Sequence, residues 1–91
     1  MSDELRILVI KEGDVFVAQC LEYDICTQAN SFGEVERRMD VLLGLECRAG
    51  LNETGSEFGH IDAAPDEFHK MWDSAKAFEK SESGHRMAMA A

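Results

Sequence analysis

Residues 5–20 decide the fold: they read LRILVIKEGDVFVAQC, two apolar runs separated by a polar turn that contains Gly13. Two short runs rich in β-branched residues around such a turn are typical of a β-hairpin. The pattern predicts strands over 4–11 and 15–22, and ICTQA at 25–29 predicts a third, weaker strand. Side chains alternate between the faces of a sheet, and both alternating sets are apolar in the first two strands. Both faces of this sheet therefore need cover.

The spacing of the apolar residues changes after the third strand. Ser31 and Glu34 have the spacing of a capping box, in which the Ser hydroxyl accepts a hydrogen bond from the backbone of the third helical residue. Apolar residues then recur at steps of three and four, which predicts a helix over 32–49 that stops at Gly50. The residues of this apolar stripe are Val35, Met39, Leu42, Leu43 and Cys47.

The second half of the chain carries weaker signals. Pro65 suits the first position of a helix, and the acidic residues that follow it suit the positive end of the helix dipole. A second amphipathic helix is therefore predicted over 65–80. A short strand over 57–61 (EFGHI) is left as an open alternative, and residues 81–91, which lack periodicity, are predicted to form a flexible tail.

These elements predict an α+β fold in the order β-β-β-α-(β)-α. Three antiparallel strands, or four with the open alternative, pack against two helices in a single domain over 1–80, as suits a chain of 91 residues. If the two helices cover one face of the sheet, the other face is an exposed apolar patch. We therefore expect a homodimer or a larger homo-oligomer.

The charge balance limits the possible partners. The chain has 9 basic and 18 acidic residues, a net charge of −9, and both halves are acidic. Because affinity for nucleic acid comes first from basic side chains, we expect no binding to DNA or RNA. The acidic start of the chain is unlike a signal peptide, and the apolar stretches, of about seven residues, are too short to span a membrane. These features favour a cytoplasmic protein that does not bind membranes.

The three cysteines do not suggest a metal site or a catalytic nucleophile. Cys20, Cys26 and Cys47 form no Cys-x-x-Cys pair and share no ligand spacing with the histidines, so no zinc site is expected. Cys20 and Cys47 fall on apolar positions, which predicts buried, inert thiols. Phosphate-binding loops and hydrolase motifs are missing from the sequence as well, and no cofactor is expected.

Two sets of charged residues have an ordinary and a functional interpretation. Asp14, Glu22 and Asp24 flank turns, where carboxylates serve solubility and turn geometry, but together they could hold a divalent metal ion. Arg37 and Arg38 are adjacent in the first predicted helix, where they form either a solvated mixed-charge face or an anchor for an acidic surface. The candidate contacts to a partner are Arg37, Arg38, Glu22 and Asp24.

Three segments carry a family pattern: VIKEGDVFVAQC at 9–20, CTQA at 26–29 and SFGE at 31–34. A hairpin around Gly-Asp, a third strand after an acidic turn and a Ser-x-x-Glu helix start resemble the HicB-like antitoxin family over about residues 5–50. The resemblance implies a fold like a truncated ribonuclease H core and a dimeric or larger assembly.

The resemblance also implies a function. HicB-like antitoxins bind a small basic HicA-like ribonuclease, and many carry an additional DNA-binding segment, which the few residues after position 80 leave no room for. We therefore expect a non-enzymatic HicB-like binding module, an antitoxin whose acidic surface attracts a small basic ribonuclease. Two alternatives stay open: an orphan homo-oligomer without a toxin, and a metal-dependent hydrolase that uses Asp14, Glu22 or Asp24.

Overall fold

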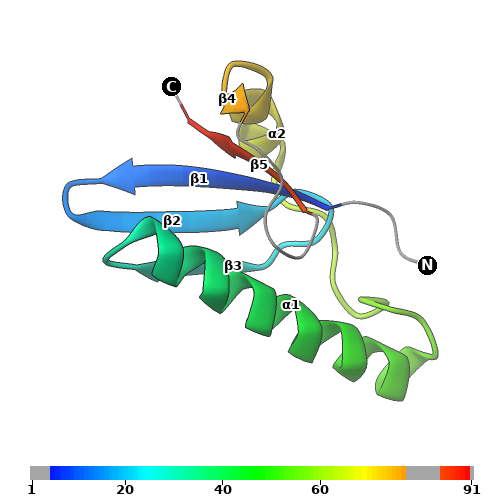
Figure 1. Ribbon diagram of the computed structural model, residues 1–91. Coiled ribbons are helices and arrows are strands. Elements are labelled where there is room, and N and C mark those ends of the chain that lie inside the picture. Colours follow the sequence, from blue (N-terminus) through cyan, green and yellow to red (C-terminus); the bar gives the residue numbers. More distant parts are fainter. Residues whose placement is uncertain (1–4, 78–84, 91) are drawn as a thin grey trace.

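The computed structural model describes residues 5–77 and 85–90. They form a five-stranded sheet in the order β3-β2-β1-β5-β4 with two helices, so the predicted α+β class is confirmed (Figure 1). The elements are β1 (Arg6–Glu12), β2 (Val15–Cys20), β3 (Cys26–Ala29), α1 (Phe32–Thr54), α2 (Asp66–Asp73), β4 (Lys76–Ala77) and β5 (Arg86–Met89).

The first three strands form the predicted antiparallel meander. Ile7 lies opposite Cys20 and Glu12 lies opposite Val15 in the β1–β2 hairpin, and β3 pairs with β2. Gly13 in the hairpin turn has φ +60°, a backbone conformation that glycine adopts without steric cost. The predicted strand positions are therefore confirmed to within two residues over the part of the chain that the structure describes.

The last strand corrects the prediction of a flexible tail. Arg86–Met89 form β5, which pairs in parallel with β1, so the sheet is mixed rather than antiparallel and extends beyond residue 80. Met87 and Ala88 are buried. Four residues are too few to show a period in the sequence, and the pairing with β1 depends on a contact across almost the whole chain. Residues 81–84 and 91 of the predicted tail lie outside the described residues.

The end of α1 also differs from the prediction. The helix continues to Thr54, and Gly55, at φ +80°, provides the left-handed stop by donating its N–H to Leu51 O at 3.0 Å. Gly50 is a buried residue inside the helix. A Cβ built at Gly50 would lie 2.5 Å from the Phe58 backbone nitrogen, so this glycine allows the following loop to approach α1 closely.

Two further predictions after α1 are wrong. Residues 57–61 do not form a strand: residues 57–60 form turns, with Phe58 in the left-handed region (φ 56°) and its ring stacked on Tyr23. The second helix ends at Asp73 because the chain turns at Ser74, whose backbone N–H and hydroxyl both donate to Met71 O. The two residues of β4 follow, and positions 78–80 of the predicted helix lie outside the described residues.

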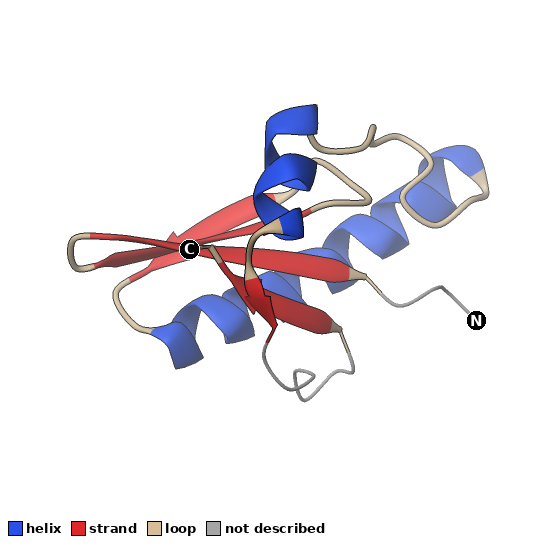
Figure 2. Cartoon of the chain, turned by 90° about the horizontal axis from the view of Figure 1, so that it is seen from above, coloured by secondary structure: helices blue, strands red, loops and turns tan. Residues whose placement is uncertain are grey.

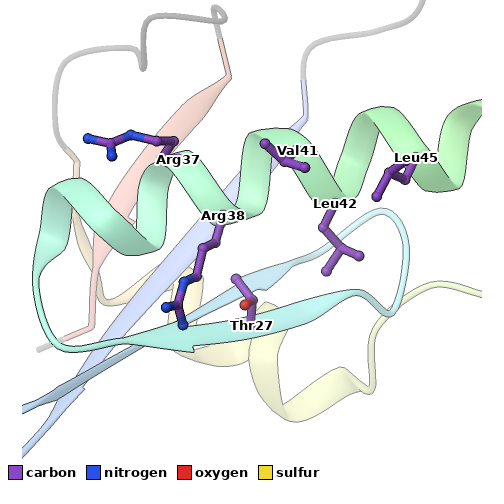
Figure 3. A pocket seen from close by; sticks show the side chains of 6 residues that line it. All are labelled: Thr27, Arg37, Arg38, Val41, Leu42 and Leu45. Atoms are coloured by element: carbon purple, nitrogen blue, oxygen red, sulfur yellow. The ribbon is translucent and has the colours of Figure 1, made fainter.

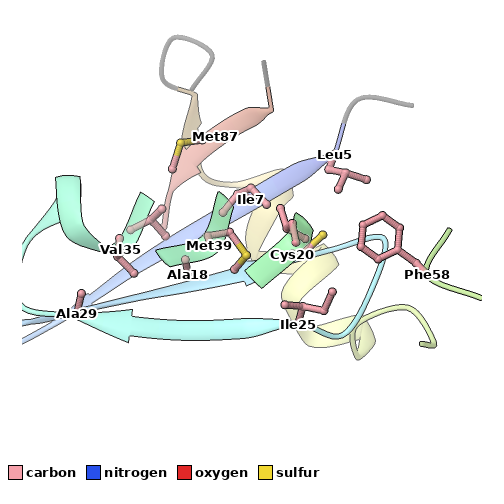
Figure 4. Packing of buried hydrophobic residues seen from close by; sticks show 12 residues of the cluster. Leu5, Ile7, Ala18, Cys20, Ile25, Ala29, Val35, Met39, Phe58 and Met87 are labelled. Atoms are coloured by element: carbon pink, nitrogen blue, oxygen red, sulfur yellow. The ribbon is translucent and has the colours of Figure 1, made fainter. Parts of the chain in front are cut away.

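The two helices lie on opposite faces of the sheet (Figure 2). On the first face, Val35, Met39 and Leu43 of α1 pack in the main core (Figure 4) with buried residues of the strands, such as Ile7 and Val9. Each face of the sheet therefore has one helix. The assumption that both helices cover the same face is wrong.

The second face is covered mainly at one end. The Trp72 ring of α2 lies 5.9 Å from the Arg6 guanidinium and 5.8 Å from that of Arg86. Leu8 of this face is fully buried, whereas Ile10, two residues further along β1, is only half-buried. The apolar surface that remains on this face is thus smaller than the sequence predicts.

Candidate protein-interaction surfaces

A groove of about 380 Å³ runs between α1 and the free edge of β3. We call it the α1–β3 groove. Figure 3 shows the side chains of Arg38 and Leu42 pointing from α1 toward β3, whereas Arg37 points away from the strand. The lining residues are Thr27, Arg37, Arg38, Val41, Leu42 and Leu45.

The apolar part of this groove comes from residues outside the buried stripe of α1. Val41 and Leu45 are one helical turn apart and are 59% and 51% exposed. Single exposed apolar side chains are ordinary on protein surfaces, but two that share a groove beside a sheet edge are typical of a docking surface. In the sequence, Val41 and Leu45 are an apolar i, i+4 pair next to the predicted apolar stripe. The sequence analysis did not single out this pair.

The free edge of β3 offers backbone hydrogen-bonding groups. Cys20 N–H donates to Ile25 O at 2.9 Å, so the alternation of an antiparallel pair directs the N–H and C=O groups of Cys26 and Gln28 away from β2. Arg38 Nη1 donates to Gln28 O at 2.8 Å. The strand has four residues, and a short edge strand capped by a charged side chain is protected against non-specific pairing.

Both predicted arginines are on this surface. Arg37 Nη1 and Arg38 Nε lie 3.9 and 3.6 Å from the carboxylate of Glu34, and the Arg37 side chain is 74% exposed. The predicted mixed-charge face is therefore present. Because Arg38 also lines the groove, it remains a candidate contact to a partner.

A second hollow of about 460 Å³ adjoins the groove at the other end of β3. Leu42 lines both hollows, and Glu46 Oε2 lies 2.8 Å from His60 Nε2 beside the second one. The surface therefore changes from arginines at one end, through apolar side chains, to carboxylates at the other. The residues around the second hollow are Asp24, Ile25, Cys26, Leu42, Glu46 and Ile61.

The predicted contact Glu22 serves the fold of this chain. Its Oε1 accepts a hydrogen bond from the Arg6 backbone N–H at 2.8 Å, and its Oε2 lies 2.5 Å from Arg6 Nε. The pair fastens the loop after β2 to the start of β1. Glu22 is consequently a weaker candidate for contact with a partner than the sequence predicts.

The predicted contact Asp24 lies between two loops. Its backbone N–H donates to Asp62 O at 2.7 Å, and its Oδ1 accepts from Gln19 Nε2 at 3.1 Å. A second backbone bond, from Ala64 N–H to Leu21 O at 3.1 Å, joins the same two loops. The sequence analysis did not single out Asp62, and it assigned the acidic residues after Pro65 only to the helix dipole. We give the name acidic loop pair to four exposed residues: Asp24 and Asp62 of these loops, with Asp66 and Glu67 at the start of α2.

The carboxylates considered for a metal site are not brought together. Asp14 lies in the β1–β2 turn, whereas Glu22 and Asp24 follow the other end of β2. Across residues 5–77 and 85–90, no three His, Cys, Asp or Glu side chains are placed to hold a metal ion.

The thiols differ in exposure. Cys20 is buried as predicted, Cys47 is half-buried and Cys26 is exposed. Burial raises the pKa of the Cys20 thiol, and desolvation together with the nearby Glu57 carboxylate raises the pKa of Cys47. Both shifts favour the neutral thiol at neutral pH, whereas a cysteine nucleophile needs the thiolate.

Within the described part of the chain, neither helix is long and apolar enough to cross a membrane. No protein-family model matches the sequence, and no curated protein or solved structure matches it significantly.

Proposed function

We propose that this protein is a non-enzymatic binding module that holds a small basic protein, as a HicB-like antitoxin holds a basic ribonuclease. The observation that carries the proposal is the acidic loop pair, four exposed carboxylates in a chain of net charge −9. A cationic surface is attracted to such a set at long range and is oriented by it on contact.

The loops that carry Asp24 and Asp62 are held in place before a partner arrives, and Asp66 and Glu67 follow at the start of α2. The two backbone bonds between the loops, Asp24 to Asp62 and Ala64 to Leu21, fix their relative position. Tyr23 and Phe58 stack beside them, with ring centroids 4.2 Å apart. A surface that is already ordered loses little conformational entropy on binding, which favours affinity.

Calorimetric titration of the purified protein with small basic HicA-like ribonucleases tests the proposal. We expect a complex that weakens as salt is added, because exposed charges are screened. The double variant Asp62→Asn/Glu67→Gln should raise Kd by about tenfold or more. Glu12→Gln/Glu53→Gln, which removes two exposed charges elsewhere, is the matched control and should change Kd much less.

Co-expression provides the functional readout. The wild-type chain should restore growth to cells that express the cognate ribonuclease, and Asp62→Asn/Glu67→Gln should do so less well. Equal losses of affinity in the two double variants would contradict the acidic loop pair as the contact. Divalent-metal-dependent cleavage of nucleic acid by the pure protein, abolished by Asp24→Asn, would contradict the non-enzymatic role.

A further inference from the structure

We infer that the α1–β3 groove is closed by a second copy of this chain, related to the first by a two-fold axis beside Thr27. The inference rests on other observations than the proposed basic partner, which would contact the acidic loop pair; the two surfaces share Asp24. Three properties of the groove lead to it: the order of its charges, the free backbone groups of β3 and the exposed apolar residues of α1.

The charges along the α1–β3 groove and the adjoining second hollow are self-complementary under a two-fold rotation. Arg38 marks the cationic end, Glu46 marks the acidic end, and Leu42 lies between them. A two-fold axis near the middle reverses the direction of the second groove, so that each arginine meets the carboxylate of the other copy. A small basic protein would instead bring its own positive charge against Arg37 and Arg38, which makes it a poorer occupant.

The free edge of β3 suits the same rotation. With Thr27 on the axis, Cys26 of one copy lies opposite Gln28 of the other, and both residues direct their backbone groups outward. Each such pair can exchange two N–H to O hydrogen bonds. Gln28 O already accepts from Arg38, but a carbonyl oxygen has a second lone pair. The two five-stranded sheets would then be continuous.

The exposed apolar residues complete the interface. The two copies of α1 lie on the same face of the joined sheet and run antiparallel across the axis. Val41 and Leu45, which are more than half exposed in the single chain, would pack against their counterparts. The second copy thus accounts for apolar residues on the β3 side of α1 that the core of the single chain does not use.

A matched pair of variants tests the apolar contact. We expect the wild type to be a dimer by light scattering at micromolar concentration and Leu45→Asp to be a monomer. Leu51→Asp is the control, because Leu51 is 45% exposed on the same helix but does not line the groove. It should remain a dimer. Far-UV circular dichroism establishes that both variants are folded.

A charge exchange tests the two-fold arrangement itself. Arg38→Glu and Glu46→Arg should each raise the dimer Kd by about tenfold or more, because like charges then meet at both ends of the interface. A mixture of the two single variants should form heterodimers, and the double variant Arg38→Glu/Glu46→Arg should again form homodimers. Loss of the intrachain contacts of Arg38 and Glu46 cannot produce this rescue.

A cross-link tests the position of the axis. Thr27 would face its own counterpart in a non-hydrogen-bonded pair, where Cβ atoms are about 4.5–5.5 Å apart. Thr27→Cys in a Cys26→Ser background should therefore give a disulfide-linked dimer under mild oxidation.

Three results would overturn the inference: a monomeric wild type at micromolar concentration, equal effects of Leu45→Asp and Leu51→Asp, or no heterodimer in the mixture. The double variant Asp62→Asn/Glu67→Gln, which should weaken the complex with a basic protein, should remain dimeric. The proposed function and the proposed dimer can therefore be refuted independently of each other.

Discussion

The two faces of the sheet differ in how much of the strand surface their helices cover. α1 has 23 residues, is capped by Ser31 and Gly55, and buries Val35, Met39 and Leu43. α2 has eight residues, no side-chain cap and no fully buried residue. Because a helix of this length is marginal by itself, α2 depends on its contact with the sheet. The comparison shows that apolar strand residues of the same kind need not contribute equally to stability.

The largest difference should appear along β1 on the face that α2 covers. Leu8→Ala should lower the free energy of unfolding by about 2–5 kcal/mol, because a fully buried side chain leaves a cavity. Ile10→Ala, at a half-buried position on the same face, should cost less than about 1.5 kcal/mol. Urea unfolding measures the free energy of unfolding of both variants. Equal decreases in the two variants would mean that α2 does not determine which strand residues are covered.

Two glycines of α1 should respond with opposite signs. Gly50→Ala should lower stability by about 1–3 kcal/mol, because the new Cβ meets the backbone of Phe58 and Ser56. Gly44→Ala has open space around its Cβ and should raise stability by about 0.5–1 kcal/mol through helix propensity. Thermal unfolding of the two variants checks the signs. A stabilising Gly50→Ala would show that the loop does not need its close approach to the helix.

The buried thiol on the α1 face should make stability depend on pH. Burial raises the pKa of Cys20, so the thiol of the unfolded chain, with a pKa of about 8.5, ionises before that of the folded chain. The stability from the neutral thiol is therefore complete below that pH and is lost above it, by up to about 1.4 kcal/mol per pH unit. Urea unfolding under reducing conditions from pH 7 to about pH 10 should show a smaller decline in Cys20→Ala. Parallel profiles of the two proteins would refute this assignment.

A small effect should also come from the aromatic contact on the α2 face. Trp72→Leu should lower the free energy of unfolding by about 1 kcal/mol, because it removes the ring that both Arg6 and Arg86 approach. Trp72→Phe keeps an aromatic face and should lose less. Thermal unfolding followed by circular dichroism compares the two variants. If Trp72→Phe is as unstable as Trp72→Leu, the decrease in stability comes from lost packing and not from the contact between the aromatic ring and the arginines.

The features that were predicted correctly depend on local signals. The hairpin follows from Gly13 between two apolar runs, and the start of α1 follows from Ser31, whose Oγ accepts from Glu34 N–H at 3.2 Å. The incorrect predictions depend on distant contacts. Gly50 resembles a helix stop in the sequence, but its surroundings come from the loop around Phe58, and β5 is recognisable only by its pairing with β1.

The candidate surfaces follow the same rule: the residues with a local signal were predicted, and those brought together by distant contacts were not. Adjacent charges drew attention to Arg37 and Arg38 in the sequence, and Arg38 does line the groove. The apolar lining of the groove and the opposite charge of Glu46 at the second hollow arise because α1 lies beside an edge strand, which the sequence pattern alone does not define. The acidic loop pair depends likewise on backbone bonds between segments about 40 residues apart.

The parallel pairing of β5 with β1 has a consequence for the order of folding. Arg6 pairs with Arg86, so the central strand of the sheet receives its second neighbour from a segment 80 residues later in the chain. During synthesis on the ribosome, the hairpin, β3 and α1 are complete while one side of β1 still exposes unpaired backbone groups. A nascent chain in this state can add a foreign strand, and chaperone binding at β1 before residue 86 emerges would protect it.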